Sequence, residues 1–176
     1  FGEIGGGTGN DDRFIAAPKV FYYSKDLSMN LLLNSNNIGD PPLSRRDFYR
    51  FGGGFNNLNA RTGTSINISS DDAGITELQN NRAKSIDAQF GAYNFSYSPT
   101  ESLEFSGFAI YSRAENHLEE KNTRTYNVSN EVEETSEISV QDTEQELYKF
   151  SAEFNPNETL QTEYNLLYKT SSQEEV

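Results

Sequence analysis

The chain has 176 residues, a formal net charge of −13, and a hydrophobic content of 34%. A mean hydropathy of −0.74 argues against an ordinary globular core, and the lack of Cys excludes thiol catalysis within this chain. The acidic balance argues against nucleic acid and against an anionic membrane surface as partners.

Aromatic residues are nevertheless plentiful, with ten Tyr and twelve Phe. A chain that is polar on average but rich in these residues suits strands with one apolar face and one polar face. Disorder is the alternative, because low hydrophobicity and high net charge favour it. Disorder accounts for the polar segments but not for the regular alternation described next.

Seven strands are expected in chain order, because apolar and polar residues alternate within them. We place them at 2–8, 13–24, 26–37, 85–98, 102–114, 144–155 and 159–171. In the fourth, the apolar residues change face between Ile86 and Tyr93, and either a bulge or a packed contact in the lumen would explain this change.

The connections between these strands differ at the two ends. Short turns near 24–26, 98–101 and 155–158 lie at one end, and the long charged segments 39–84 and 115–143, expected as outer loops, lie at the other. This asymmetry is the layout of an outer-membrane β-barrel. We therefore predict an all-β fold over 1–176: an antiparallel, up-and-down segment of a transmembrane β-barrel. Seven strands cannot close such a barrel, so a longer barrel is expected.

The alternation assigns the two faces of the expected sheet. Residues on one face are expected to contact lipid: Leu27, Met29, Leu31, Leu33, Tyr148, Phe150, Tyr164 and Leu166. Their neighbours are expected to line the lumen: Asn30, Asn34, Lys149, Glu153, Glu163 and Asn165. Aromatic residues beside the short turns predict an interfacial girdle, with cross-strand packing in a soluble sheet as the alternative: Tyr22, Tyr23, Tyr93, Phe95, Tyr97 and Phe154.

Several segments resemble TonB-dependent receptor-like outer-membrane proteins. Those similar to the opening part of that barrel are 1–4 (FGEI) through 9–14 (GNDDRF), 21–29 (FYYSKDLSM) and 33–38 (LNSNNI). Those similar to the following extracellular loop are 43–53 (LSRRDFYRFGG) and 74–76 (GIT). The second half of the chain is similar only in its pattern of strands and loops.

The resemblance implies a barrel of about 22 strands around an N-terminal plug, in the outer membrane of a Gram-negative bacterium. It implies nutrient import energised by the TonB protein, with outer-membrane lipids as further partners. Neither the plug nor the TonB-binding box is visible in this chain. A surface lipoprotein or a larger membrane complex stays open as a partner.

Within the first long loop, Ser44 and Asp47 could cap a short helix from which three arginines project. We expect contact with an anionic ligand or a partner through Arg45, Arg46, Arg50, Phe51 and Phe55. A solvated loop helix without a ligand is the alternative.

No catalytic, metal or cofactor site is expected. His117 is the only histidine, which excludes a multi-histidine zinc site, and the acidic segment lacks the spacing of a calcium loop. Two other functions stay open: a soluble or surface-attached β-sandwich for binding or adhesion, and a structural subunit or folding client of a larger outer-membrane assembly. A sandwich predicts turns of similar length at both ends.

Overall fold

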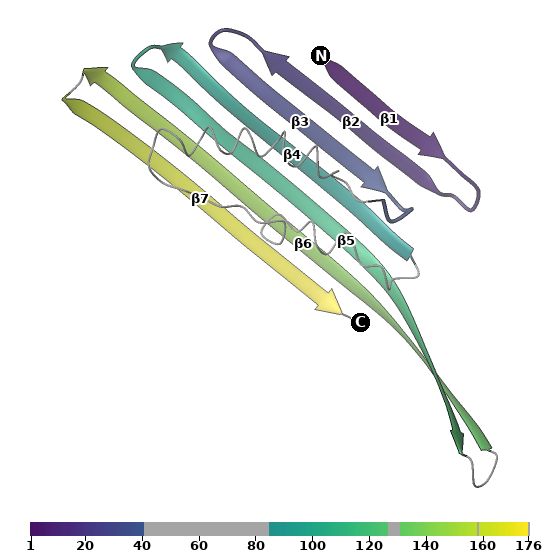
Figure 1. The fold of residues 1–176 in the computed structure, drawn as a ribbon. Coiled ribbons are helices and arrows are strands. Elements are labelled where there is room, and N and C mark those ends of the chain that lie inside the picture. The colour runs from purple at the N-terminus through teal and green to yellow at the C-terminus, as the bar shows by residue number, and fades with distance from the viewer. Residues whose placement is uncertain (41–84, 127–130, 158, 176) are drawn as a thin grey trace.

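The computed structural model describes residues 1–40, 85–126, 131–157 and 159–175 (Figure 1). It contains a single antiparallel sheet whose strands follow chain order from β1 to β7. The bounds are Gly2–Thr8 (β1), Phe14–Tyr23 (β2), Leu27–Asn36 (β3), Ser85–Thr100 (β4), Leu103–Tyr126 (β5), Glu131–Asn157 (β6) and Leu160–Glu175 (β7). The expected seven-stranded, up-and-down, all-β architecture is confirmed. The sheet is open, with β1 and β7 at its edges.

The connections β2–β3, β4–β5 and β6–β7 lie at one end of the sheet, and the β1–β2 turn lies at the other (Figure 1). In the β1–β2 turn, Asp11 and Asp12 adopt φ angles of 58° and 56°. Aspartate tolerates this left-handed region because its short side chain bonds to the local backbone. In the β6–β7 turn, the Asn157 side-chain oxygen accepts hydrogen bonds from the backbone N–H groups of Thr159 and Leu160, at 3.1 and 2.9 Å.

Residues 115–143, expected as an outer loop without strands, form strand for most of their length, while their place outside a membrane stays a prediction. β5 continues to Tyr126 and β6 begins at Glu131, and the pairing of these strands runs without a register shift from Tyr126 and Glu131 back to Leu103 and Phe154 (Figure 1). This extension is exposed on both faces near its end, so it lacks the apolar alternation that marks a half-buried strand. Residues 41–84 of the other expected loop lie outside the described residues.

Of the two explanations offered for the change of face in the fourth strand, the bulge is wrong. β4 pairs with β3 and β5 in constant register along the segment where the apolar residues change face, and the register shifts only beside the turn, between Tyr97 and Thr100. Ile86 and Phe90 are buried on one face, and Tyr93 belongs to the opposite face. The apolar residues of this regular strand simply move from one face to the other along its length.

One face of the sheet, here called the polar face, holds the buried side chains. Its apolar core comprises Leu32, Ile86, Ala88, Phe90, Ala92, Phe108, Ile110, Ala114 and Leu147. Buried polar residues accompany that core: Asn30, Asn34, Asn36, Asn94, Ser106, Ser112, Asn116, Thr143, Lys149, Ser151 and Glu153. Hydrogen bonds connect some of them across strands. Asn30 donates from Nδ2 to Asn94 Oδ1 at 2.7 Å, and Ser151 Oγ donates to Asn165 Oδ1 at 2.6 Å.

Candidate membrane-facing surface

The opposite face of the sheet, here called the apolar face, collects all eight residues expected to contact lipid. Side chains of directly paired residues project from the same face of a sheet. Residues that pair across successive strands form a row; one such row contains Leu31, Tyr93, Ala109, Tyr148 and Tyr168. The other expected residues occupy the neighbouring rows of this face: Leu27, Met29, Leu33, Phe150, Tyr164 and Leu166.

Most of the exposed large hydrophobic side chains lie on the apolar face and most of the buried side chains lie on the polar face, although Tyr23 and Leu167 are exposed on the polar face. Large hydrophobic side chains exposed on the apolar face come from every strand except β5: Ile4, Phe14, Val20, Tyr22, Leu33, Tyr97, Tyr148, Phe150, Phe154, Tyr164, Leu166 and Tyr168. On the polar face, by contrast, Asn30 and Lys149 retain only 8% and 5% exposure. A soluble sheet normally leaves its polar side chains to water, whereas this sheet buries eleven polar residues beside its apolar core and leaves large hydrophobic side chains exposed on the opposite face. A continuous apolar surface of this kind marks an interaction site.

The apolar side chains form a band of limited height. On β5 the band covers residues 103–111, about nine residues, and a tilted strand that crosses a membrane needs 9–11. The last row of the band contains Leu33, which pairs with Gly91, and Tyr111, which also pairs with Gly91. On β6 this row already holds a charged residue, Glu146. The next row on the same face is polar, with Ser35, Gln89, Arg113 and Glu144. We call residues of the apolar face up to the Tyr111 row the apolar band.

Aromatic contacts connect the rows of the apolar band. Rings stack between Tyr93 and Phe95 and between Phe105 and Phe150, with centroids 6.0 and 6.3 Å apart. Tyr148 and Tyr168 lie 6.1 Å apart across β6 and β7. Such pairs stabilise a sheet by about 0.5–1.5 kcal/mol each beyond the area that they bury.

Gly107 lies at the centre of the apolar band, between Phe95 and Phe150 on the neighbouring strands. A Cβ atom at Gly107 would lie 2.6 Å from the backbone oxygen of Lys149 and 3.0 Å from the Phe95 ring. Only glycine therefore lets the strands and this ring approach so closely.

Tyr23 does not belong to the aromatic set of the apolar face. It projects from the polar face, because its partner Ser28 follows the parity of Asn30, and its hydroxyl donates to Asn30 Oδ1 at 2.6 Å. The other aromatic residues expected in the girdle lie on the apolar face: Tyr22, Tyr93, Phe95, Tyr97 and Phe154.

Beyond the apolar band, the same face becomes charged. Arg113 donates from Nε and Nη2 to the two carboxylate oxygens of Asp142, at 3.1 and 2.6 Å. The hydrogen bond from Arg113 holds the pKa of Asp142 below its ordinary range, although desolvation acts in the opposite direction. The bond to Asp142 raises the pKa of Arg113 in turn.

Sequence reasoning missed one group of side chains beside this ion pair. From sequence alone His117 is a lone histidine, whereas the structure places its Nε2 2.9 Å from Glu115 Oε1, with Asp87 on the neighbouring strand. The spacing of Glu115 and His117 on one face of a strand was the only signal in the sequence. Asp87 joins them because it pairs with Glu115 across β4 and β5.

The residues expected to contact a ligand or partner lie outside the part of the chain that the structure describes. Arg45, Arg46, Arg50, Phe51 and Phe55 all fall within 41–84, outside the described residues. Their role stays a prediction.

Among the described residues, no helix has the length and apolar character needed to cross a membrane. No protein-family model, curated protein or solved structure matches the chain.

Proposed function

We propose that this chain forms part of the wall of an outer-membrane β-barrel, with the apolar band against lipid and the polar face toward the lumen. The distribution of side chains carries the proposal: large hydrophobic residues are exposed on the apolar face, while asparagine, serine and lysine side chains are buried beside the apolar core on the other. A membrane barrel has this arrangement, because its outer face meets hydrocarbon and its lumen is polar.

The free energy gained by removing apolar side chains from water supports lipid as the surroundings of the apolar face. Burying a large hydrophobic side chain fully stabilises a fold by about 1.5–3 kcal/mol. The twelve exposed side chains named above are on average about half exposed, so covering them is worth about 9–18 kcal/mol in total. That is comparable with the whole stability of a typical domain, about 5–15 kcal/mol. This face therefore requires a cover, and lipid would supply one along its whole width.

A β-sandwich is the less favourable alternative. It requires a second sheet against the apolar face. All seven described strands instead belong to one sheet, and the side chains that this sheet buries lie on its polar face.

A TonB-dependent receptor for nutrient uptake is the specific barrel that we propose. This part rests on the resemblance of the early segments, with the TonB protein as the source of energy and the plug elsewhere in the receptor. Contact with the ligand or with a surface partner is proposed for the segment with Arg45, Arg46, Arg50, Phe51 and Phe55. A structural subunit of a larger assembly would share the apolar band but would need neither a plug nor a ligand.

The intact mass of the native polypeptide, extracted with detergent from the outer-membrane fraction, tests the receptor. A receptor predicts a mass several times 19.8 kDa in that fraction, with a plug sequence upstream of these strands. A native polypeptide near 19.8 kDa would contradict the receptor and leave a barrel completed by partners. Recovery from the soluble fraction alone would contradict both.

A further inference from the structure

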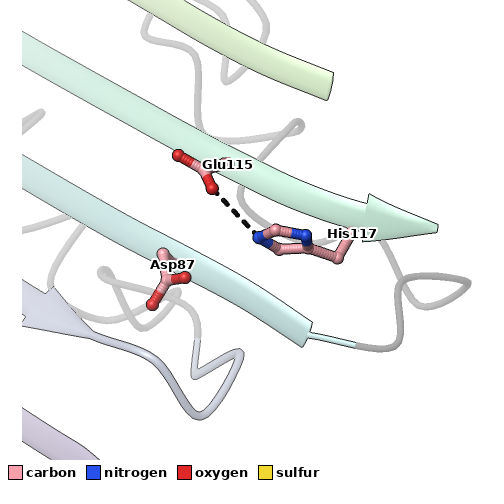
Figure 2. Close-up of side chains that lie close together, drawn as sticks. All are labelled: Asp87, Glu115 and His117. Carbon is pink, nitrogen blue, oxygen red and sulfur yellow. Dashed lines mark hydrogen bonds and ion pairs between the residues drawn. The ribbon is translucent and has the colours of Figure 1, made fainter. Parts of the chain in front are cut away.

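Three potential metal ligands gather on the apolar face just beyond the apolar band. Asp87 projects from β4, and Glu115 and His117 project from β5 (Figure 2). Each offers a donor atom, and these atoms all lie within 4.8 Å of one another. His117 Nε2 and Glu115 Oε1 already lie 2.9 Å apart. The register fixes this arrangement, because Asp87 pairs directly with Glu115, and His117 follows two residues later on the same face.

The surroundings of this group are strongly acidic. Each strand from β4 to β7 contributes a carboxylate to one continuous cross-strand row: Asp87, Glu115, Asp142 and Glu174. Like charges placed directly opposite each other destabilise a sheet. The guanidinium of Arg113 is hydrogen-bonded to Asp142 on β6, whereas Asp87 lies on β4, on the opposite side of Glu115. His117 can offset the charge of Glu115 only when it is protonated, and Asp87 then still adds a negative charge.

We propose that Asp87, Glu115 and His117 bind a divalent transition-metal ion such as Zn²⁺. One imidazole nitrogen with two carboxylate oxygens suits Zn²⁺, whereas Ca²⁺ and Mg²⁺ prefer oxygen ligands alone. Ligand bonds of about 2.0–2.2 Å bring the donor atoms of a tetrahedral site to about 3.5 Å from each other. Asp87 Oδ lies within 4.8 Å of the other two donor atoms, so small rotations of the exposed Asp87 side chain toward them, and of Glu115 and His117 away from each other, bring the three donors to this spacing.

The ion would also relieve the repulsion between the paired carboxylates. Glu115 and His117 keep 37% and 38% of their side-chain surface exposed, so the remaining coordination positions are accessible to water. The site connects β4 to β5 at the level where the sheet leaves the apolar band. It does not depend on the proposed receptor function, because all three ligands and their register belong to the described strands.

Calorimetric titration of the detergent-solubilised native protein with Zn²⁺ tests the site. We expect one ion per chain at this site, and at least about tenfold weaker binding for His117→Gln and for Asp87→Asn. Glu174→Gln is the matched control, because it removes a carboxylate from the same row on a different strand, and its affinity should equal that of the wild type. Excess Ca²⁺ should not displace the bound Zn²⁺.

X-ray absorption of the Zn²⁺-loaded wild-type protein provides a second measurement that does not depend on folding of a variant. The site predicts one imidazole nitrogen in the coordination shell at about 2.0–2.1 Å. A shell of oxygen atoms only would overturn the proposal. Equal weakening by Glu174→Gln and His117→Gln would overturn it as well, because the ion would then be held by the general acidity of this surface.

Discussion

Replacement of Leu31 by arginine places a charge inside the apolar band. Leu31 belongs to the row of Tyr93 and Ala109, which lies two residues from the central row of Gly107. At about 3.4 Å per residue and a tilt near 45°, Leu31 lies about 5 Å from the middle of the band. A lipid-facing arginine costs about 2–4 kcal/mol at the midplane and about 0–1 kcal/mol near the interfaces. We therefore expect Leu31→Arg to lower the free energy of unfolding by about 2–3 kcal/mol.

The matched control is Ser35→Arg, on the same strand and the same face but one row beyond Leu33. It should cost no more than about 1 kcal/mol, because it lies at the edge of the lipid. Urea titration of the protein in phospholipid vesicles, followed by circular dichroism, measures both variants. A difference of about 2 kcal/mol corresponds to roughly 30-fold in the unfolding equilibrium. Equal stability of the two variants would refute lipid contact at Leu31, since surface substitutions in water usually change stability by less than about 0.5 kcal/mol.

Two further substitutions probe the packing and the charges of the sheet. Gly107→Ala should lower the unfolding free energy by about 1–3 kcal/mol, because the added Cβ would lie 2.6 Å from the Lys149 backbone oxygen. Gly91→Ala is its control, with no contact closer than 3.4 Å, and an equal loss of stability for both would contradict the steric argument. Asp142→Asn should destabilise the protein at neutral pH, since Arg113 lowers the pKa of Asp142 in the folded state. That contribution is present above about pH 4 and is lost as the pH falls through the lowered pKa, so the difference between wild type and variant in urea titrations should shrink steadily as the pH falls below about 4. A difference that stays constant as the pH falls would contradict a role for the Asp142 charge.

The assignment of residues to the two faces of the sheet is most reliable from sequence where apolar and polar residues alternate strictly. Leu27, Met29 and Leu31 gave a period of two that needs no knowledge of neighbouring strands. β4 was harder, because Ile86 and Phe90 belong to the buried core of the polar face while Tyr93 belongs to the apolar band. The segment around Ile86 and the segment around Tyr93 each indicate a strand, but the change of face between them is also the pattern of a bulge. Only the register with β3 and β5 shows that the strand is regular.

The extended β5–β6 hairpin could not be predicted from apolar periodicity. Near its end, both faces of the hairpin are exposed, and cross-strand polar contacts replace a buried face. Tyr126 donates from its hydroxyl to Glu133 at 2.8 Å, and Arg124 lies 3.9 Å from the same carboxylate. The polar composition of residues 115–143 therefore predicts a loop, although threonine and tyrosine also favour strands.

The group of Asp87, Glu115 and His117 illustrates a different limit. Glu115 and His117 are two residues apart, so any strand assignment places them on one face. Asp87 lies on another strand, and its place depends on a register that no local pattern specifies. A site that combines ligands from two strands becomes visible only once that pairing is known.

The most direct test of the central claim compares two adjacent leucines of β7. Leu166 and Leu167 are almost equally exposed, at 54% and 52%, but they project from the apolar face and the polar face respectively. Because residues 1–176 contain no cysteine, Leu166→Cys and Leu167→Cys each add one labelling site for a fluorophore within this part of the protein. In vesicles that contain brominated lipid, we predict strong quenching by the lipid at position 166 and little at 167. Equal quenching at both positions would contradict an apolar face embedded in the membrane.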